Sequence, residues 1–208
     1  MEAVGYELFC KMLNQAVAHL KGETIEEDFE TTVDLDIDGY IPESYIEDEF
    51  EKLNMYKKIS AIRDEQDLDD IRAELEDRFS EIPQVTQNLL NIAYIKSRAH
   101  ECFVTEIENA KQTGRKGFKI TLLRTAPVDT YKMLDIVRRN AAEMRFVADK
   151  DPFFVFTPAE QTGDVVSIKT QLIRFFDIIS EMLEKPETQI LQTIGQPAVQ
   201  EKGGTNAE

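Results

Sequence analysis

The sequence predicts an α+β fold, with helices packed around a small sheet of short hairpins. Two observations support this class. In the first half, apolar residues recur at three- and four-residue steps over long segments, which is the period of a helix. The second half instead contains short runs rich in β-branched and aromatic residues, separated by polar turns. Helices and hairpins clustered in this way favour α+β over a parallel α/β layout.

The N-terminal part is predicted to contain a helix, a linker and a strand. Residues 3–20 have an amphipathic helical pattern that stops at Gly22, and residues 23–30 are acidic and poor in apolar side chains. Residues 31–38 then alternate, which predicts a half-buried strand. The strand's inward face would carry Val33, Leu35 and Ile37.

Three helices are expected next. Ser44, with Glu47 three residues later, has the spacing of a capping box and predicts where the first helix begins. The expected apolar stripe of this first helix is Phe50, Leu53, Met55, Tyr56 and Ile59. The second covers residues 65–79, with Leu68, Ile71, Leu75 and Phe79 on its apolar side. The third begins near Pro83 and carries Val85, Leu89, Leu90, Ile92, Ala93 and Ile95.

A hairpin and a helix are predicted after residue 102. The two strands would be residues 103–108 and 117–123, joined by a polar turn at 111–116. Residues 128–142 have a helical pattern, with Tyr131, Leu134, Ile136 and Val137 as its apolar side chains.

A second strand pair and a final helix complete the predicted fold. The strands are residues 144–148 and 153–156, and the helix covers 165–183. Its apolar side comprises Ile168, Leu172, Ile173, Phe176, Ile179 and Met182. Proline and glycine and the lack of apolar periodicity predict a disordered tail at residues 186–208.

Charge and hydropathy exclude several classes of protein. The net charge of −16 argues against a general nucleic-acid binder, because such a surface repels phosphates. Residues 22–51 hold thirteen acidic side chains and no basic one, whereas residues 111–139 hold eight basic against two acidic. No apolar run is long enough to span a bilayer, and no signal peptide is apparent, so we expect a cytoplasmic location and no membrane partner.

No catalytic or metal-binding constellation is apparent in the sequence. It lacks the glycine and lysine spacing of a phosphate loop and the motifs of nucleotide-binding, hydrolase and zinc-protease sites. Cys10 and Cys102 are far apart in sequence and are expected to be free, buried thiols. His19 and His100 have no spacing that would supply converging metal ligands. We therefore expect no enzyme activity, cofactor or metal in this chain.

Two motifs stand out in the first half: residues 40–59 are YIPESYIEDEFEKLNMYKKI, and residues 74–79 are ELEDRF. They resemble the acidic start and the ELxDRFG motif of the C-terminal (TRCF) domain of bacterial transcription-repair coupling factors, the Mfd family. Residues 82–93 match the run that follows, and residues 4–13 resemble the helix that leaves the second motor lobe. Ser80 stands where the family has glycine, which leaves the end of that helix uncertain.

The resemblance implies a piece of a larger DNA translocase. Residues 1–22 would be the helix from the end of the motor lobe, and residues 31–185 the C-terminal regulatory domain. In the family, this domain folds back on the UvrB-homology module, covers the surface that binds UvrA and holds the factor at rest until RNA polymerase is engaged. ATP and Mg²⁺ would be bound by the parent motor and not by this chain.

The resemblance also implies the site residues. Glu74 and Asp77 share a helix face and would contact arginines of the UvrB-homology module, while Arg78 would pair within its own domain. An alternative function is an accessory contact to DNA or RNA polymerase, although we do not expect DNA binding by the chain itself. That contact would use a basic patch comprising Arg115, Lys116, Lys119, Arg138 and Arg139.

Overall fold

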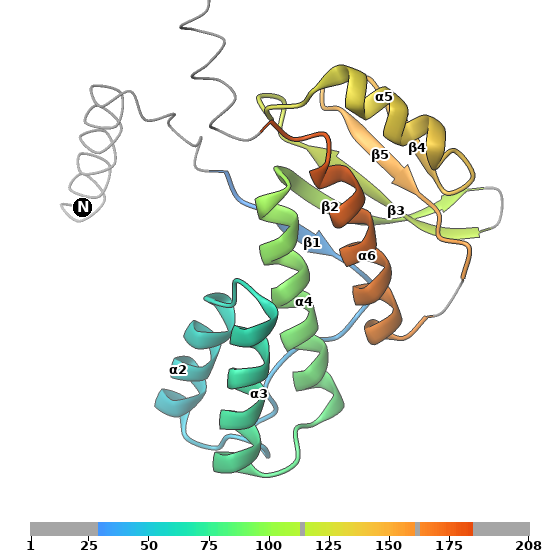
Figure 1. Cartoon of the computed structure of the whole chain (residues 1–208). Helices are drawn as coiled ribbons and strands as arrows, with labels where there is room; N and C mark the ends of the chain where they lie inside the picture. The colour runs from blue at the N-terminus through green and yellow to red at the C-terminus, as the bar shows by residue number, and fades with distance from the viewer. Residues whose placement is uncertain (1–28, 113–114, 161–162, 185–208) are drawn as a thin grey trace, which may run out of the picture. The chain divides into compact units, whose positions relative to one another are not determined.

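A computed structural model describes residues 29–112, 115–160 and 163–184 (Figure 1). All of them except Phe29 and Glu30 belong to a compact unit that begins at Thr31. Its helices and five-stranded mixed sheet confirm the predicted α+β class. The predicted helix at residues 3–20 and the predicted tail at 186–208 lie outside the described residues, as does nearly all of the acidic linker.

The sheet has the strand order β1-β2-β3-β5-β4. β1 runs parallel to β2, and the other neighbouring pairs are antiparallel. The parallel pair joins segments about seventy residues apart, because Val33 lies opposite Ile107. The strand bounds are β1 Thr32–Asp34, β2 Val104–Gln112, β3 Arg115–Leu122, β4 Met144–Val147 and β5 Phe153–Phe156.

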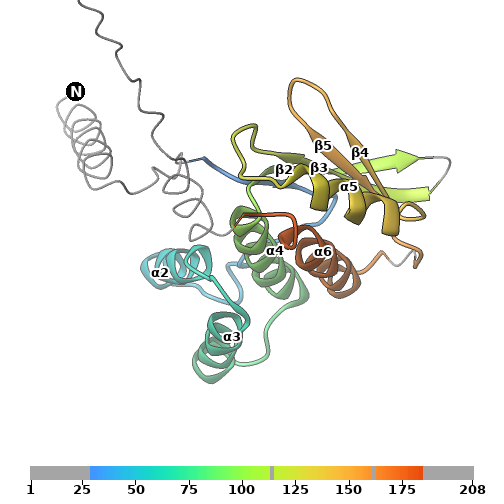
Figure 2. The same cartoon turned by 45° about the horizontal axis from the view of Figure 1, so that its top comes forward.

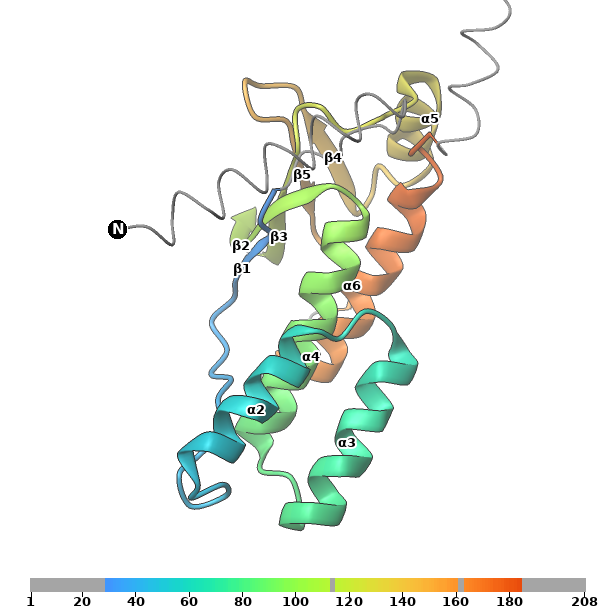
Figure 3. The ribbon, with the colours of Figure 1, turned by 90° about the vertical axis from the view of Figure 1, so that its left-hand side faces the viewer.

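Helices cover one face of this sheet and extend beyond it. Figure 2 shows α4 and α6 on the same side of the strands. α2 and α3 form a helical hairpin that packs against α4, away from the sheet (Figure 3). The helix bounds are α2 Glu49–Ser60, α3 Glu65–Phe79, α4 Gln84–Glu101, α5 Thr130–Arg139 and α6 Val165–Ser180.

The sheet core is rich in phenylalanine. The ring centroid of Phe175 lies 5.5 Å from that of Phe154 and 5.0 Å from that of Phe156, and all three side chains are buried. Aromatic pairs at this spacing stabilise a core beyond the burial of their area. Cys102 lies in the same cluster, where burial raises the pKa of its thiol to about 12. This confirms the expected free, buried thiol for Cys102, whereas Cys10 lies outside the described residues.

A second core joins the helical hairpin to α4. It contains ten buried residues, from Ile41 to Tyr94. α4 contributes to both cores, because Leu90 and Tyr94 belong to the hairpin core, whereas Ile95 and Ala99 belong to the sheet core. The two cores are therefore joined by one continuous helix.

The predicted start of α2 at Ser44 is wrong. The Pro42 carbonyl accepts the Tyr45 and Ile46 N–H groups at 3.1 and 3.2 Å, which closes a turn over these residues. The helix begins at Glu49, and the Asp48 carboxylate accepts the Glu51 N–H at 2.8 Å as its N-cap. Asp is as good a cap as Ser, and the turn already holds Ser44 outside the helix.

The predicted turn at residues 111–116 is also wrong, because most of it is strand. Lys111 lies opposite Lys116 and Gln112 opposite Arg115, so the β2–β3 ladder continues to the tip of the hairpin.

Other bounds differ by a few residues. The predicted strand at residues 31–38 is regular only over β1, yet Leu35 is buried and Asp34, Asp36 and Asp38 are exposed, so the predicted alternation of faces holds. The predicted helix at 128–142 is shorter, because the Asp129 carboxylate caps it by accepting from Tyr131 and Lys132. Among the described helices, none is long and apolar enough to cross a bilayer.

Candidate docking surface on the helical hairpin

The two acidic residues implied by the resemblance have different surroundings in the structure. α2 and α3 lie side by side and antiparallel (Figure 3), with Glu74 on the α3 side of the seam between them. Both carboxylate oxygens of Glu74 accept from Lys58 Nζ at 2.6 Å, and Oε1 also accepts from Arg78 Nη1 at 2.9 Å. Glu74 thus binds two cations of its own domain.

Arg78 extends this network to the start of α2. Its second guanidinium nitrogen pairs with Glu51, so the expected pairing of Arg78 within its own domain is confirmed. Hydrogen bonds from Lys58 and then Arg78 lower the pKa of Glu74, and those to Glu51 and then Glu74 raise the pKa of Arg78. The four-residue network therefore links the start of α2 to the end of α3.

Asp77, in contrast, faces away from the seam and the core. Its side chain is exposed and forms no hydrogen bond or ion pair with any described residue. It is three positions from Glu74, so the two acids are neighbours on the helix surface. Of these two acids, Asp77 is the one that presents an unpaired carboxylate to a partner.

Two of the apolar residues predicted for the α2 stripe are exposed. Phe50 is 70% exposed and Leu53 is 52% exposed, whereas Met55 and Ile59 are buried. Phe50 and Ile59 are nine residues apart, about two and a half helical turns, so they lie on opposite sides of α2. The sequence alone could have shown this. At about 100° per residue, Phe50 and Leu53 fall on the opposite side of the helix from Met55 and Ile59.

The helix α5 also departs from its predicted stripe. Ile136 is buried and Val137 packs against the sheet core, but Tyr131 is 88% exposed and Leu134 is 59% exposed. The hydroxyl of Tyr131 and the proximity of polar neighbours lower the cost of this exposure.

The predicted basic patch is divided over two elements. Arg115, Lys116 and Lys119 lie on β3, whereas Arg138 and Arg139 lie at the end of α5. Lys119 pairs with Glu108 at 2.7 Å, Arg138 with Asp135 at 3.2 Å, and Arg139 with both Asp135 and Glu181. These acids reduce the charge that the patch could offer to phosphates. A nucleic-acid contact stays a prediction.

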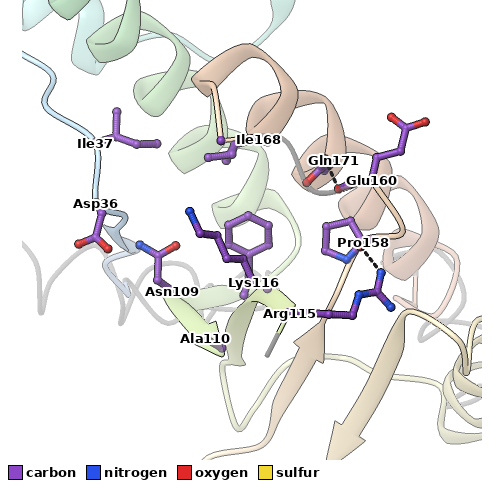
Figure 4. Close-up of a pocket in the computed structure, with 13 residues that line it drawn as sticks. Asp36, Ile37, Asn109, Ala110, Arg115, Lys116, Pro158, Glu160, Ile168 and Gln171 are labelled. Atoms are coloured by element: carbon purple, nitrogen blue, oxygen red, sulfur yellow. Dashed lines mark hydrogen bonds between the residues drawn. The ribbon is translucent and has the colours of Figure 1, made fainter. Parts of the chain in front are cut away.

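A pocket of about 470 Å³ opens at the end of the sheet, between the exit of β1, the β2–β3 hairpin and α6 (Figure 4). Ile37, Phe118, Pro158 and Ile168 provide its apolar lining. Arg115 lies at its edge, but its guanidinium donates to the Pro158 carbonyl at 2.8 Å. The charged residues that line it are Asp36, Glu160, Arg115 and Lys116, so the pocket has no dominant charge.

No group of three or more metal-ligating side chains occurs in the parts of the chain that the structure covers. The expectation that the chain binds no cofactor stays a prediction.

Comparisons with known proteins agree on one family. Residues 35–133 match the model of the TRCF domain. The chain is 31% identical over 137 residues to a transcription-repair-coupling factor of Bacillus subtilis, which covers 65% of this chain and 12% of that protein. It is 32% identical over 154 residues to the transcription-repair-coupling factor of Rickettsia bellii, a match that covers 73% of this chain and 13% of that protein. The chain thus spans about an eighth of these relatives.

One solved structure is also similar, and it is described as a crystal structure of the C-terminal domain of transcription-repair coupling factor. It superposes with a TM-score of 0.60 at 25% identity. The match covers 74% of this chain and 93% of the solved one, so it includes most of that domain.

Proposed function

The chain belongs to the TRCF domain family of transcription-repair coupling factors, and from that premise we propose that it is a non-catalytic regulatory module of such a factor. It docks on the UvrB-homology module of its parent protein, masks the surface that binds UvrA and keeps the translocase at rest in the bacterial cytoplasm. The parent motor, not this module, binds ATP and Mg²⁺. RNA polymerase engagement releases the contact.

One observation carries this proposal: Asp77 is an unpaired carboxylate on the outward face of a helical hairpin that a four-residue ion-pair network holds together. A docking surface benefits from such preorganisation, because less side-chain and backbone freedom is lost on binding. An acidic group presented in this way suits a partner with exposed arginine or lysine side chains.

The strength of the contact also suits a releasable latch. An exposed ion pair contributes only about 0–1 kcal/mol, so Asp77 by itself supports weak docking. A weak intramolecular contact can be opened by any partner that binds the open state more tightly. Tethering within one protein would then supply the effective concentration that the contact needs.

Asp77→Lys tests the proposal more cleanly than a reversal of Glu74, which would also break the pairs with Lys58 and Arg78. We expect the wild-type chain to bind a purified UvrB-homology module from the same organism at low salt, measured by calorimetry. Asp77→Lys should weaken this binding about tenfold, because the reversal removes the attraction and also adds repulsion between like charges. Asp151→Lys, in the exposed turn between β4 and β5, makes the same charge change away from the hairpin and should bind as the wild type does.

The full-length factor provides the functional readout. There, Asp77→Lys should increase UvrA binding in the absence of RNA polymerase, because the masked surface becomes available. Unchanged UvrA binding by Asp77→Lys, together with no association of the separate wild-type modules at high concentration, would contradict the proposal.

A further inference from the structure

The outward face of α2 carries an apolar pair that nothing in the described structure covers. Phe50 and Leu53 are three residues apart, hence neighbours on the helix surface, and are 70% and 52% exposed. Scattered single apolar residues on a surface are ordinary, but adjacent large ones are typical of interaction sites. This pair is therefore a candidate contact surface.

Charge distinguishes the pair on α2 from the similar pair on α5. The segment leading into α2 and the first three residues of the helix are acidic, through Glu43, Glu47, Asp48, Glu49 and Glu51. The lysines of α2 do not offset this charge at the pair, because Lys52 pairs with Glu49, and Lys57 and Lys58 lie in the last turn. The α5 pair, Tyr131 and Leu134, has Lys132, Arg138 and Arg139 on its own helix and only Asp135 as an acid within it. A partner whose apolar site is bordered by arginine and lysine side chains would complement α2 and not α5.

The apolar pair is also continuous with the surface that carries Asp77. Arg78 follows Asp77 directly and pairs with Glu51, the residue after Phe50. The start of α2 and the end of α3 consequently lie at the same end of the hairpin, as Figure 3 shows. Phe50 is nine positions from the buried Ile59, and Asp77 is nine positions from the buried Leu68, so both project away from the hairpin core. One partner face can therefore reach both.

We propose that Phe50 and Leu53 are the apolar anchor of the docking surface, with Asp77 and the Glu51–Arg78–Glu74–Lys58 network as its charged border. The inference rests on the docking proposed above and identifies the residues that supply most of its affinity. Binding energy in interfaces concentrates in large desolvated side chains surrounded by polar contacts that exclude water. The partner face would accordingly hold an apolar site edged by basic side chains, into which Phe50 inserts.

The test compares two matched double variants by calorimetric titration against the UvrB-homology module. Phe50→Ala with Leu53→Ala should weaken binding at least tenfold and make the heat-capacity change of binding less negative, because less apolar surface is buried. Tyr131→Ala with Leu134→Ala removes a similar exposed pair and should bind within about twofold of the wild type. All four side chains are exposed, so thermal unfolding of both variants should stay close to that of the wild type.

The outcomes separate the two proposals. If the wild type binds, and the Phe50/Leu53 variant binds equally well with an unchanged heat-capacity change, the apolar anchor is wrong while the docking stands. Equal losses in the α2 and α5 variants would also contradict the anchor. If the wild type does not bind at all and Asp77→Lys leaves UvrA binding of the full-length factor unchanged, the docking itself is wrong, and the anchor with it.

Discussion

Ser80 has a backbone conformation that glycine adopts far more readily. At the end of α3 its φ is 73° and its ψ is −158°, a region in which a side chain is strained by roughly 1–3 kcal/mol. Its carbonyl still accepts a hydrogen bond from the Tyr45 hydroxyl at 3.2 Å, so the strained position is held by a tertiary contact. The resemblance left the end of this helix uncertain at this residue, and the structure places it at Phe79.

Replacing Ser80 by glycine should stabilise the protein. We expect Ser80→Gly to increase the free energy of unfolding by about 1 kcal/mol, which raises Tm by about 2–4 °C, because the relief of strain exceeds the added freedom of the unfolded chain. Ser60→Gly is the control. Ser60 is the last residue of α2 and has a helical conformation, so glycine there should lower the stability of the protein. Thermal unfolding followed by circular dichroism measures both, and a lower Tm for Ser80→Gly would contradict the prediction.

At the scale of elements, the close approach of β3 and β5 depends on Gly117. A Cβ atom at this position would lie 2.5 Å from the Phe156 carbonyl oxygen and 3.0 Å from Thr157 Oγ1. The first of these is a backbone atom, so the strand itself would have to move. The sequence pattern marked Gly117 only as the start of a strand, whereas it also sets the spacing of the sheet's centre.

Gly117→Ala should therefore destabilise the sheet. We expect a loss of about 1–3 kcal/mol in the free energy of unfolding, measured by urea denaturation. Gly163→Ala is the matched control, because a Cβ atom there meets nothing within 4 Å. If both variants unfold at the same urea concentration as the wild type, the close contact between β3 and β5 is not a constraint on stability.

The elements themselves could largely be predicted from the sequence, because their cores follow simple periods. Residues 65–79 were predicted as one helix and form α3 without a shift, and Leu68 and Leu75 are fully buried as expected. The start of α2 was predicted wrongly, because Ser44 has the spacing of a capping box but the turn at Pro42 holds it outside the helix. Strand order could not be predicted either, because β1 pairs with a strand some seventy residues away.

The candidate site was only partly predictable for a related reason. The resemblance implied that Glu74 and Asp77 act together, but Lys58 on a neighbouring helix ties Glu74 into its own domain. A pairing between helices leaves no periodic signal in the sequence. The exposure of Phe50 and Leu53, in contrast, was available from their angular position on α2.

At the scale of the whole molecule, charge is distributed unevenly around the two cores. Acidic side chains gather on the approach to α2, and the basic residues between 111 and 139 lie on the β2–β3 hairpin and α5. Such an asymmetry orients a charged partner as it approaches, and its effect falls as salt screens the field. A basic partner face would thus meet the helical hairpin before the sheet, which agrees with the proposed docking surface.

The sharing of α4 between the two cores has a consequence for the order in which the chain folds during synthesis. The buried residues of the hairpin core all lie between Ile41 and Tyr94. In contrast, β1 can pair only after β2 has been synthesised, and the sheet core is complete only after α6 has been synthesised. Local contacts form faster than distant ones, and a ribosome releases the N-terminal part first. A chain ending at Cys102 should then already be helical, and its Met55 should be protected from oxidation. If this shortened chain is fully unfolded, the helices need the sheet in order to assemble.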